Sequence, residues 1–425
     1  MKRLLYIAHR VPYPPDKGER VRAFHQIRAL ADHFRVTVAA LAHSRQDRQS
    51  AQTLEQWCER AVAAPAGGTL GLARGTLALL RGKSVTEGYF RSRLLAQILK
   101  EETAREPFNI IVTYSSSALP YGLAIPAGAR VADLVDADSA KWAAYAHSAR
   151  WPKSWLYRRE AEGVRRLERQ AVNECDAVVL VSEAEAEALD AAGDKVIAVG
   201  NGVDTDYFQP QERPADATPT LVFTGTMDYR PNVEGVCWFA EAIWPGLRRE
   251  RPDLRFVIVG RNPAPAVRRL AEQPGIEVTG SVPDVRPYLA RATLVVAPLL
   301  MARGIQNKVL EAMAMGRAVV ASPAALEGLD VASLAEVIEA QPPEAWQREI
   351  MDLLKNDARR EAVEHAARAC IERNYTWEAR LEPLVNLCLR LANERDGTAQ
   401  NMAGRENREP EGRAPAPLRS EGTAP

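Results

Sequence analysis

Short apolar runs alternate with amphipathic, helix-length segments along most of the chain. In the first half, the apolar runs predict strands at residues 4–8, 36–41, 110–114, 131–135, 177–181 and 195–199, and residues 19–33 predict a helix. In the second half, they predict strands at residues 220–224, 255–259, 277–279, 293–298, 318–321 and 335–338. This alternation is typical of parallel, doubly wound sheets. The pattern therefore predicts an α/β protein with two Rossmann-like domains.

Interruptions of the pattern indicate the domain boundaries. A chain of 425 residues is too long for a single core, and a turn-rich segment begins at Gly200. Trp377 and Leu381 start a run of apolar residues at helical spacing, whereas the last thirty or so residues contain hardly any apolar side chains. We expect an N-terminal domain at residues 1–200, a second domain at 201–375, a last helix at 376–393 and a disordered tail at 394–425.

Charge and cysteine content narrow the function classes. Fifty-five basic and 55 acidic residues give a formal net charge of zero, so no overall field attracts nucleic acid. The five cysteines are widely spaced and lack any CxxC or Cys/His ligand pattern, which indicates reduced thiols and no metal site. Together with an N-terminus that predicts a strand and not a signal peptide, this favours a cytoplasmic protein.

The segment from Arg303 to Gly316 contains the strongest chemical signal. It places Gly304, Lys308 and Glu311 around the start of a helix that follows a predicted strand. Helix N-termini at this edge of an α/β sheet favour phosphate, because free N–H groups and the helix dipole point at the ligand. Lys308 and Glu311 share a helix face and offer a cation for phosphate and a carboxylate for sugar hydroxyls. A solvated pair on an ordinary crossover helix is the alternative.

Two segments resemble one enzyme family. The run RGIQNKVLEAMAMG, residues 303–316, resembles the donor-site helix of the retaining GT-B glycosyltransferases of family 4, also called group 1, and NGVDTDYFQP, residues 201–210, resembles their interdomain signature. The resemblance covers residues 1–393 and implies a GT-B fold: two Rossmann-like domains facing a cleft, with the C-terminal helix crossing back to the N-terminal domain. The family motif is Glu-x7-Glu. Glu311 matches its second, ribose-binding acid, whereas Arg303 replaces the acid that lies near the donor sugar.

The resemblance implies an enzyme that transfers a hexosyl-type sugar from a nucleotide-diphosphate sugar to a glycan or a polyprenyl-diphosphate-linked acceptor, with retention of configuration and without a cofactor or metal. Lys308 and Glu311 would act on the donor. At finer detail, residues 303–314, DADSAKW at 136–142 and TGTMDYRPN at 224–232 resemble sugar transferases of bacterial exopolysaccharide and exosortase (PEP-CTERM) loci. That similarity implies exopolysaccharide synthesis on the cytoplasmic face of the plasma membrane.

Further donor residues follow from the family's loops. Gly18 stands where the family has a glycine-rich loop facing the donor phosphates. Thr226 and Arg230 lie in the loop that supplies phosphate-binding cations in related transferases; the usual cations are missing here, and Arg230 is their nearest replacement. Arg261 and Val282 lie in the segments expected to form the nucleobase pocket. Lys17 and Arg20 are weaker candidates, since each fits an ordinary charged helix start.

The acceptor side is expected after the strand at residues 131–135. Where the family has a histidine loop, this chain has Asp136 and Asp138, either of which can orient or deprotonate an acceptor hydroxyl. Asp138 is the better placed if the strand ends at Asp136, although it also fits a helix N-cap. His9 and His147 are lesser candidates.

Residues 141–170 contain eight Lys or Arg and three Glu, interleaved with five aromatic residues. This composition favours contact with an anionic membrane surface, and a solvated helix with inward aromatics is the alternative. No nucleic-acid-binding module accompanies the patch. For the whole chain, two alternatives to a transferase remain: a non-hydrolysing nucleotide-sugar epimerase and a catalytically silent GT-B scaffold.

Overall fold

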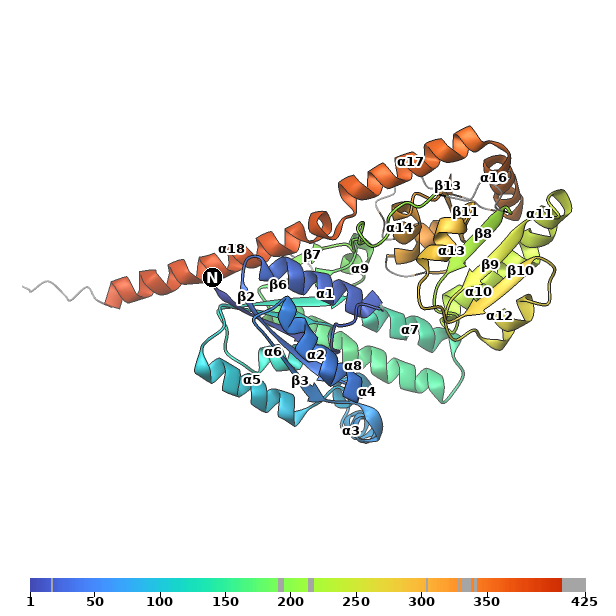
Figure 1. Ribbon diagram of the computed structural model, residues 1–425. Coiled ribbons are helices and arrows are strands. Elements are labelled where there is room, and N and C mark those ends of the chain that lie inside the picture. Colours follow the sequence, from blue (N-terminus) through green and yellow to red (C-terminus); the bar gives the residue numbers. More distant parts are fainter. Residues whose placement is uncertain are drawn as a thin grey trace, which may run out of the picture.

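The computed structural model describes residues 1–16, 18–189, 195–212, 218–302, 305–327, 329, 338–339 and 342–406, with side chains described as far as residue 394. These residues form two α/β domains that lie next to each other (Figure 1). In the N-terminal domain, Leu4 and Tyr6 pack into one hydrophobic core and Leu5 and Ile7 into another, because successive strand residues face opposite sides of the sheet. The predicted pair of doubly wound, Rossmann-like domains is confirmed.

The N-terminal sheet is parallel, with the strand order β3-β2-β1-β4-β5-β6-β7. Its strands are β1 (Arg3–Ala8), β2 (Arg35–Ala42), β3 (Arg60–Pro65), β4 (Ile110–Tyr114), β5 (Ala129–Val135), β6 (Ala177–Leu180) and β7 (Val196–Ala198). The apolar pattern does not predict β3, an alanine-rich edge strand that is mostly half-buried. The strand order reverses between β1 and β4, which places a ligand-binding crevice at their carboxyl ends.

Helices follow the strands of this domain in sequence. They are α1 (Gly18–Ala31), α2 (Arg45–Thr53), the 3-10 turn η1 (Leu54–Gln56), α3 (Gly68–Leu80), α4 (Val85–Tyr89), α5 (Arg93–Arg105), α6 (Leu119–Leu123), α7 (Asp138–Ser148), α8 (Lys153–Glu174) and α9 (Glu183–Ala188). Side chains of Ser44, Ser84, Ser92 and Ser182 accept bonds from backbone N–H groups and so fix the starts of α2, α4, α5 and α9.

The second domain repeats this architecture around the strand order β10-β9-β8-β11-β12-β13. Its strands are β8 (Thr220–Thr224), β9 (Arg255–Val259), β10 (Ile276–Gly280), β11 (Leu294–Ala297), β12 (Val319–Ala321) and β13 (Ile338–Glu339). Its helices are α10 (Arg230–Trp238), the π-helical turn η2 (Phe239–Ile243), α11 (Trp244–Glu250), α12 (Pro265–Leu270), α13 (Arg286–Arg291), α14 (Asn307–Ala314), α15 (Pro323–Leu326), α16 (Pro343–Lys355) and α17 (Asp357–Asn374). The order reverses between β8 and β11, so the loops after these two strands border this domain's crevice.

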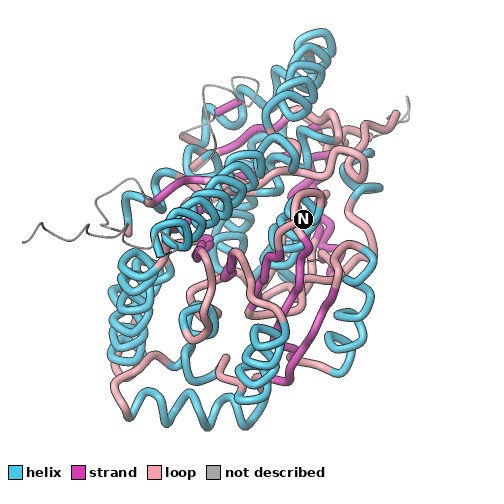
Figure 2. The backbone as a smooth tube through the Cα atoms, turned by 90° about the vertical axis from the view of Figure 1, so that its left-hand side faces the viewer, coloured by secondary structure: helices cyan, strands magenta, loops and turns pink. Residues whose placement is uncertain are grey.

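The last helix, α18 (Trp377–Glu406), returns to the N-terminal domain and lies against α1 (Figures 1 and 2). Its residues Leu381, Leu384 and Cys388 join the core formed by β1 and α1. The chain passes between the domains twice, near Val203 and near Thr376, and these two segments run side by side. The backbone N–H of Val203 donates to the carbonyl of Tyr375 at 2.8 Å. Both the fold and the returning helix therefore agree with the GT-B expectation.

The helix is longer than the sequence pattern predicts. It continues past the expected end at residue 393 to Glu406, so the expected tail does not begin at residue 394. More than half of residues 394–406 are Glu, Arg, Gln, Met or Ala, which have high helix propensity, so a lack of apolar residues did not exclude a helix here. Residues 407–425 of the expected tail lie outside the described part of the chain.

Candidate active site

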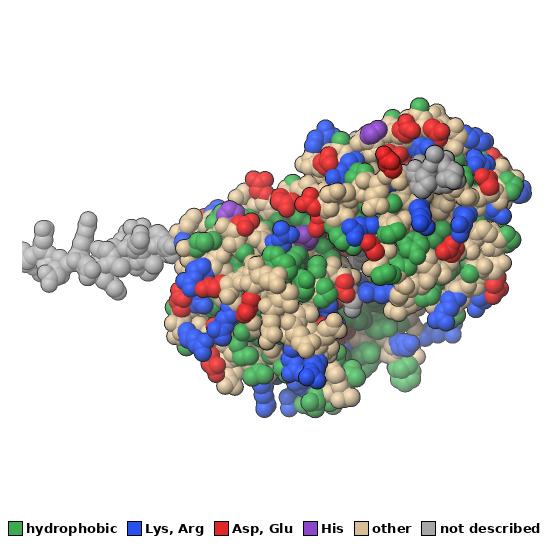
Figure 3. Space-filling model, viewed as in Figure 1, with side chains coloured by type: hydrophobic (Ala, Val, Ile, Leu, Met, Phe, Trp, Pro, Cys, Tyr) green, Lys and Arg blue, Asp and Glu red, His purple; other side chains and the backbone are tan. Residues whose placement is uncertain are grey.

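A cavity of about 800 Å³ lies between the two domains, within the size range of small-molecule sites. The lobes meet along a depression that is visible on the molecular surface (Figure 3). The N-terminal domain contributes Gly18 and His25, and the second domain contributes Thr226, Lys308 and Glu311. The cavity therefore brings together residues that are almost 300 positions apart in the sequence.

Two helix N-termini converge in this cavity. Helix α1 begins at Gly18 after β1, and α14 begins at Asn307 after β11. The helices approach so closely that a Cβ built on Gly18 would lie 3.9 Å from the Nδ2 of Asn307. Among the described residues, no side chain caps the start of α14. Because both helix dipoles present their positive ends to the same space, that space favours an anion.

Lys308 lies in the first turn of α14 and points toward the β8–α10 loop. Its Nζ donates to the Oδ1 of Asn232 at 2.5 Å and lies 4.4 Å from the ring centroid of Phe223. Burial lowers the pKa of Lys308 to about 7, against the opposing effect of the Glu311 carboxylate. Burial likewise raises the pKa of Glu311 to about 7, and Lys308 partly offsets this rise. Both groups are thus poised to change protonation near neutral pH when a ligand arrives.

The β8–α10 loop holds Lys308 in place through Asn232. The Nδ2 of this buried asparagine donates to the carbonyl of Thr226 at 2.9 Å, which fixes the amide with its oxygen toward Lys308. Gly225 leaves room for this arrangement, because a Cβ there would lie 2.7 Å from the Asn232 Nδ2. At the end of β9, a Cβ on Gly260 would lie 1.7 Å from the carbonyl oxygen of Gly225. Only glycine allows the two loops to pass at this distance.

Arg261 and Val282 line the same cavity, at the ends of β9 and β10. The guanidinium of Arg261 makes no hydrogen bond or ion pair with the rest of the described chain, so it remains available to an anion. Beyond Val282, Asp284 accepts three hydrogen bonds of 2.7–3.1 Å from the side chain of Arg286, whose guanidinium lies 3.8 Å from the ring centroid of Tyr207. These contacts hold the side chains of Tyr207 and Asp284 in place at the edge of the main cavity.

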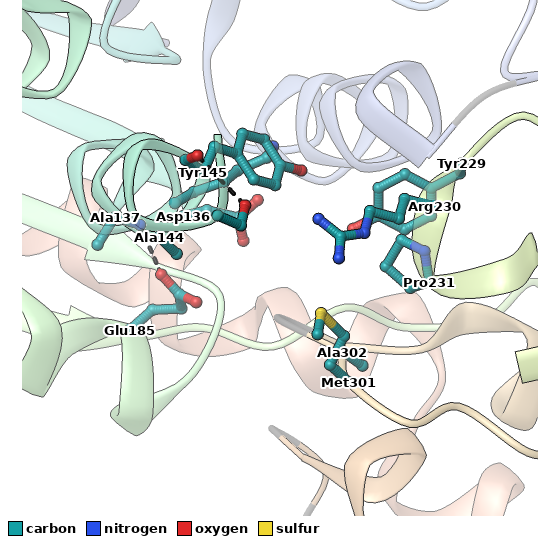
Figure 4. A pocket seen from close by; sticks show the side chains of 12 residues that line it. Asp136, Ala137, Ala144, Tyr145, Glu185, Tyr229, Arg230, Pro231, Met301 and Ala302 are labelled. Carbon is teal, nitrogen blue, oxygen red and sulfur yellow. Dashed lines mark hydrogen bonds between the residues drawn. The ribbon is translucent and has the colours of Figure 1, made fainter. Parts of the chain in front are cut away.

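A second pocket, of about 230 Å³, adjoins the main cavity next to α7. The N-terminal domain contributes Asp136, Tyr145 and Glu185, and the second domain contributes Arg230 and Met301, which point into a common space (Figure 4). Tyr229 lines both the pocket and the main cavity. The two spaces are therefore neighbouring compartments of one interdomain cleft.

Comparison with known families identifies both halves of the cleft. Residues 17–207 match the family described as Glycosyltransferase Family 4, and residues 218–356 match the family described as Glycosyl transferases group 1. The chain is built from these two glycosyltransferase domains. No curated protein sequence matches the chain.

Three solved structures illustrate the likeness of the fold. Sucrose-phosphate synthase from Thermosynechococcus elongatus aligns with a TM-score of 0.67 at 16% identity, covering 92% of this chain and 99% of that one. HepE from Anabaena, in complex with UDP and glucose, aligns with a TM-score of 0.60 at 14% identity, covering 91% and 99%. WaaG, a glycosyltransferase involved in lipopolysaccharide biosynthesis, aligns with a TM-score of 0.61 at 13% identity, covering 91% and 99%. At these identities the likeness establishes the GT-B fold.

The structure does not bring all the candidate donor residues of this glycosyltransferase together. Gly18, Thr226, Arg261, Val282, Lys308 and Glu311 line the main cavity. Arg230 faces the second pocket instead, and its Nε donates to Glu234 on the next helical turn at 2.7 Å. Arg303, Gly304 and Lys17 lie outside the described residues. Arg20 is not among the residues that line the cavity; it pairs with Asp47 at 3.1 Å and with Asp16, which does line it, at 3.4 Å.

The structure places the two acids that follow β5 differently. Strand β5 ends at Val135, as the apolar pattern predicts, and not at Asp136, the end on which the preference for Asp138 depended. The φ of 70° at Val135 turns the chain sharply. Asp136 consequently lines the second pocket, whereas Asp138 is the first residue of α7 and lies 3.7 Å from the Nζ of Lys141. Ala137, and not Asp138, is the N-cap residue.

Electrostatics also distinguish the two acids. Burial, with the carboxylates of Asp138 and Glu185 nearby, raises the pKa of Asp136 to about 7. Burial raises the pKa of Asp138 as well, but Lys141 opposes the shift. A positive φ in a β-branched residue such as Val135 is costly, and such strain concentrates at functional sites. The strained turn therefore marks Asp136 as the acid presented to the cleft.

Three features of the glycosyltransferase site escape sequence reasoning. His25 and Trp377 stack in the main cavity with ring centroids 4.5 Å apart, and burial lowers the pKa of His25 to about 4. Asn232 holds Lys308, as described above. A buried ion pair joins Arg22 to Asp133 at 2.9 Å, and Arg22 also donates to the carbonyl of Val199 at 2.8 Å. The one available signal was the position of Arg22 between Val21 and Ala23 in the predicted helix, because a charge among core-facing residues requires a partner.

Proposed function

We propose that this glycosyltransferase moves a hexosyl-type sugar from a nucleotide-diphosphate donor to a glycan or lipid-linked acceptor, with retention of configuration. One observation carries the proposal: the N-termini of α1 and α14 converge on a cavity that is also lined by Lys308 and Glu311. A diphosphate needs concentrated positive potential, and this space provides two helix dipoles and a cation. A carboxylate beside them supplies an acceptor for ribose hydroxyls.

The donor would lie along the edge of the second domain. Its diphosphate would occupy the space between Gly18 and Asn307, within reach of Lys308. The ribose would be held by Glu311, the base would lie toward Val282, and the guanidinium of Arg261 would add a further cation. UDP is the first nucleotide to test, because the HepE structure with this fold contains UDP and glucose.

The acceptor would enter through the second pocket. Tyr229 lines both compartments, so a molecule in the second pocket lies next to one in the main cavity. Asp136 faces that pocket with a pKa of about 7, so its ionised form can accept a hydrogen bond from an acceptor hydroxyl and orient it. Asp138 would act behind it by holding Lys141 in place.

The reaction would then proceed on one face of the sugar. The bond between the anomeric carbon and the diphosphate breaks, the acceptor oxygen bonds to the same face, and the acceptor proton passes to the departing diphosphate oxygen. Charge builds up on that diphosphate. The helix N-termini would stabilise it without rearrangement, which is the largest contribution that a fixed polar site makes to catalysis. Lys308 would add a cation by sharing its bond to Asn232 with the phosphate.

We further propose that the acceptor is linked to lipid and that the protein works at the cytoplasmic face of the membrane, in exopolysaccharide synthesis of the PEP-CTERM-associated type. Sequence resemblance supports the pathway. The α7–α8 hairpin supports membrane contact in part: Trp151 is 82% and Trp155 is 50% exposed. Trp142, Tyr145 and Tyr157 instead pack against one another. Among the described residues, no helix has the length and apolar character needed to cross a membrane.

The test is a panel of nucleotide sugars incubated with the protein, with nucleotide release measured with and without candidate glycan and polyprenyl-linked acceptors. Calorimetric titration with UDP and GDP accompanies it. We expect one nucleotide to bind and release to depend on the acceptor. Acceptor-independent interconversion of the donor would indicate an epimerase, and absence of nucleotide binding at millimolar concentrations would indicate a silent scaffold.

A further inference from the structure

Helix α3 carries its large apolar side chains on the outside. Leu70 is 74% exposed, Leu72 60%, Leu77 45% and Leu80 80%. Four of the most exposed large apolar side chains in the described chain thus belong to one helix of 13 residues. A helix on the surface of a globular protein ordinarily turns such residues toward the core. An outward leucine face of this kind indicates an interaction surface.

The inner face of α3 explains why the leucines cannot turn inward. It consists of buried small residues, Gly71, Gly75 and Ala78, which pack on α4. A Cβ on Gly75 would lie 2.9 Å from the Cγ1 of Val85, and one on Gly71 would lie 3.1 Å from the ring of Tyr89. Rotating α3 would force leucine side chains into these contacts. The packing therefore fixes the leucines on the solvent side.

The charge around the leucine face is positive. Residues 66–86, which contain α3 and its flanks, include three basic residues and no acidic one. Arg81 and Lys83 follow α3 directly and are exposed, and Arg166 of α8 donates to the carbonyl of Gly82. One acid, Glu87 of α4, pairs with Lys83. Basic and apolar side chains accordingly lie together over α3 at the bottom of the left-hand lobe (Figure 3).

We infer that α3 docks this protein on an anionic lipid bilayer, lying in the interface with its leucines among the acyl chains and its flanking cations at the headgroups. A helix of 13 residues is roughly 20 Å long, too short to cross a hydrocarbon core of about 30 Å but suited to lying in its surface. A second copy of the chain is the less favoured occupant, because it would bring two basic surfaces together, whereas anionic headgroups complement them.

The docking helix is connected to the acceptor side of the cleft. Helix α4, on which α3 packs, is followed by Phe90, whose ring meets the edge of the His9 ring at a centroid distance of 5.5 Å. His9 follows β1 at the carboxyl edge of the sheet, from which the cleft residues Gly18 and Asp136 also come. Docking through α3 would hold this edge near the bilayer. That consequence for the acceptor rests on the proposed function, whereas vesicle binding by α3 does not.

The experiment is flotation of the full chain with phosphatidylcholine vesicles, with and without phosphatidylglycerol. We expect binding that requires phosphatidylglycerol. Each leucine that no longer enters the lipid lowers the partition coefficient onto vesicles by roughly tenfold. The double variant Leu70→Ser, Leu77→Ser should therefore bind about a hundredfold more weakly. Leu94→Ser, the same change at a 48% exposed leucine of α5, serves as the control and should bind like the wild type. Ala73→Leu, on the exposed face of α3, should bind about tenfold more tightly.

Three results would overturn the inference. The first is unchanged flotation of the double variant; the second is equal binding of the wild type to neutral and anionic vesicles. The third is a wild-type dimer in analytical ultracentrifugation that the double variant converts to monomer, because this would assign the leucine face to a second copy. UDP titration separates the two proposals. If the wild type does not bind UDP, the proposed donor site is refuted while the vesicle result stands.

Discussion

Removing the Lys308 cation tests the proposed donor site most directly. In Lys308→Met, a side chain of similar length keeps the packing over Phe223, while the ammonium group and its bond to Asn232 are lost. The change leaves the helix itself intact, because methionine and lysine have similar helix propensities. Any effect on nucleotide binding therefore reports the charge and not the fold.

The structure sets the expected magnitude. A hydrogen bond to a charged group contributes about 1.5–3 kcal/mol. Lys308 already has a partner at 2.5 Å in the free protein, and turning toward a phosphate would exchange or share that bond. The lower end of the range therefore applies, and UDP should bind about tenfold more weakly to Lys308→Met. Glu311→Ala should weaken binding by a similar factor through the ribose.

The loss should depend on pH. In the free protein, the pKa of Lys308 is lowered to about 7 and that of Glu311 is raised to about 7, both by burial. As pH rises through this value, Lys308 loses its positive charge and with it its attraction for a diphosphate, whereas Glu311 becomes the carboxylate that accepts from the ribose. The affinity that Lys308 contributes is therefore present below pH 7 and lost above it. The ratio of wild-type to Lys308→Met affinity should accordingly be greatest below pH 7 and fall above it.

The assay is isothermal titration of UDP into both proteins over about two pH units around neutrality. Titration of UDP itself cancels in the ratio of the two affinities at each pH. Lys355→Ala, at an exposed lysine of α16 paired with Glu250, removes the same charge outside the cleft and is the control. Affinity of Lys308→Met within twofold of the wild type, or an equal loss in Lys355→Ala, would refute the reasoning.

Two further predictions concern the acceptor acid and the buried ion pair. Asp136→Asn should lower the rate of sugar transfer by roughly a hundredfold and leave UDP affinity unchanged. It should also abolish the rise of the transfer rate through pH 7, because Asp136 ionises there. A pH profile of the transfer rate and a UDP titration check this, and an unchanged pH profile would contradict it. Arg22→Met should destabilise the N-terminal domain by about 3–5 kcal/mol, because Asp133 would remain buried without its cation; urea unfolding measures the loss, and a change below 1 kcal/mol would disprove that role.

Local pattern was sufficient for most of the fold. Apolar runs of strand length separated by helical periodicity predict most strands of both sheets, because a parallel sheet buried on both faces demands such runs. Of the strand expected at residues 335–338, residues 335–337 lie outside the described part of the chain. The edge strand Arg60–Pro65 is missed, since a half-buried edge needs little apolar surface. The extra length of α18 is missed because residues 394–406 contain hardly any apolar side chains, which favoured a tail.

The candidate site could be anticipated only where one segment contains it. The three-residue spacing of Lys308 and Glu311 places both on one face of α14, and the structure puts both in the cleft. The pattern predicts the strand end at Val135, but not the positive φ of Val135, after which Asp136 and not Asp138 lines the second pocket. Such a turn is beyond pattern reasoning, because it depends on contacts with distant segments, such as the bond from the Ala137 N–H to Glu185.

The sequence by itself determined the two α/β domains, the family motifs and the residues on the face of α14, because each follows from the order of side chains within a short segment. Only the tertiary structure decided which segments meet: Gly18 with Asn307, His25 with Trp377, and Lys308 with Asn232. It also decided that the leucines of α3 face solvent. These outcomes depend on packing between segments far apart in the chain, which no local pattern of hydrophobic and polar residues specifies.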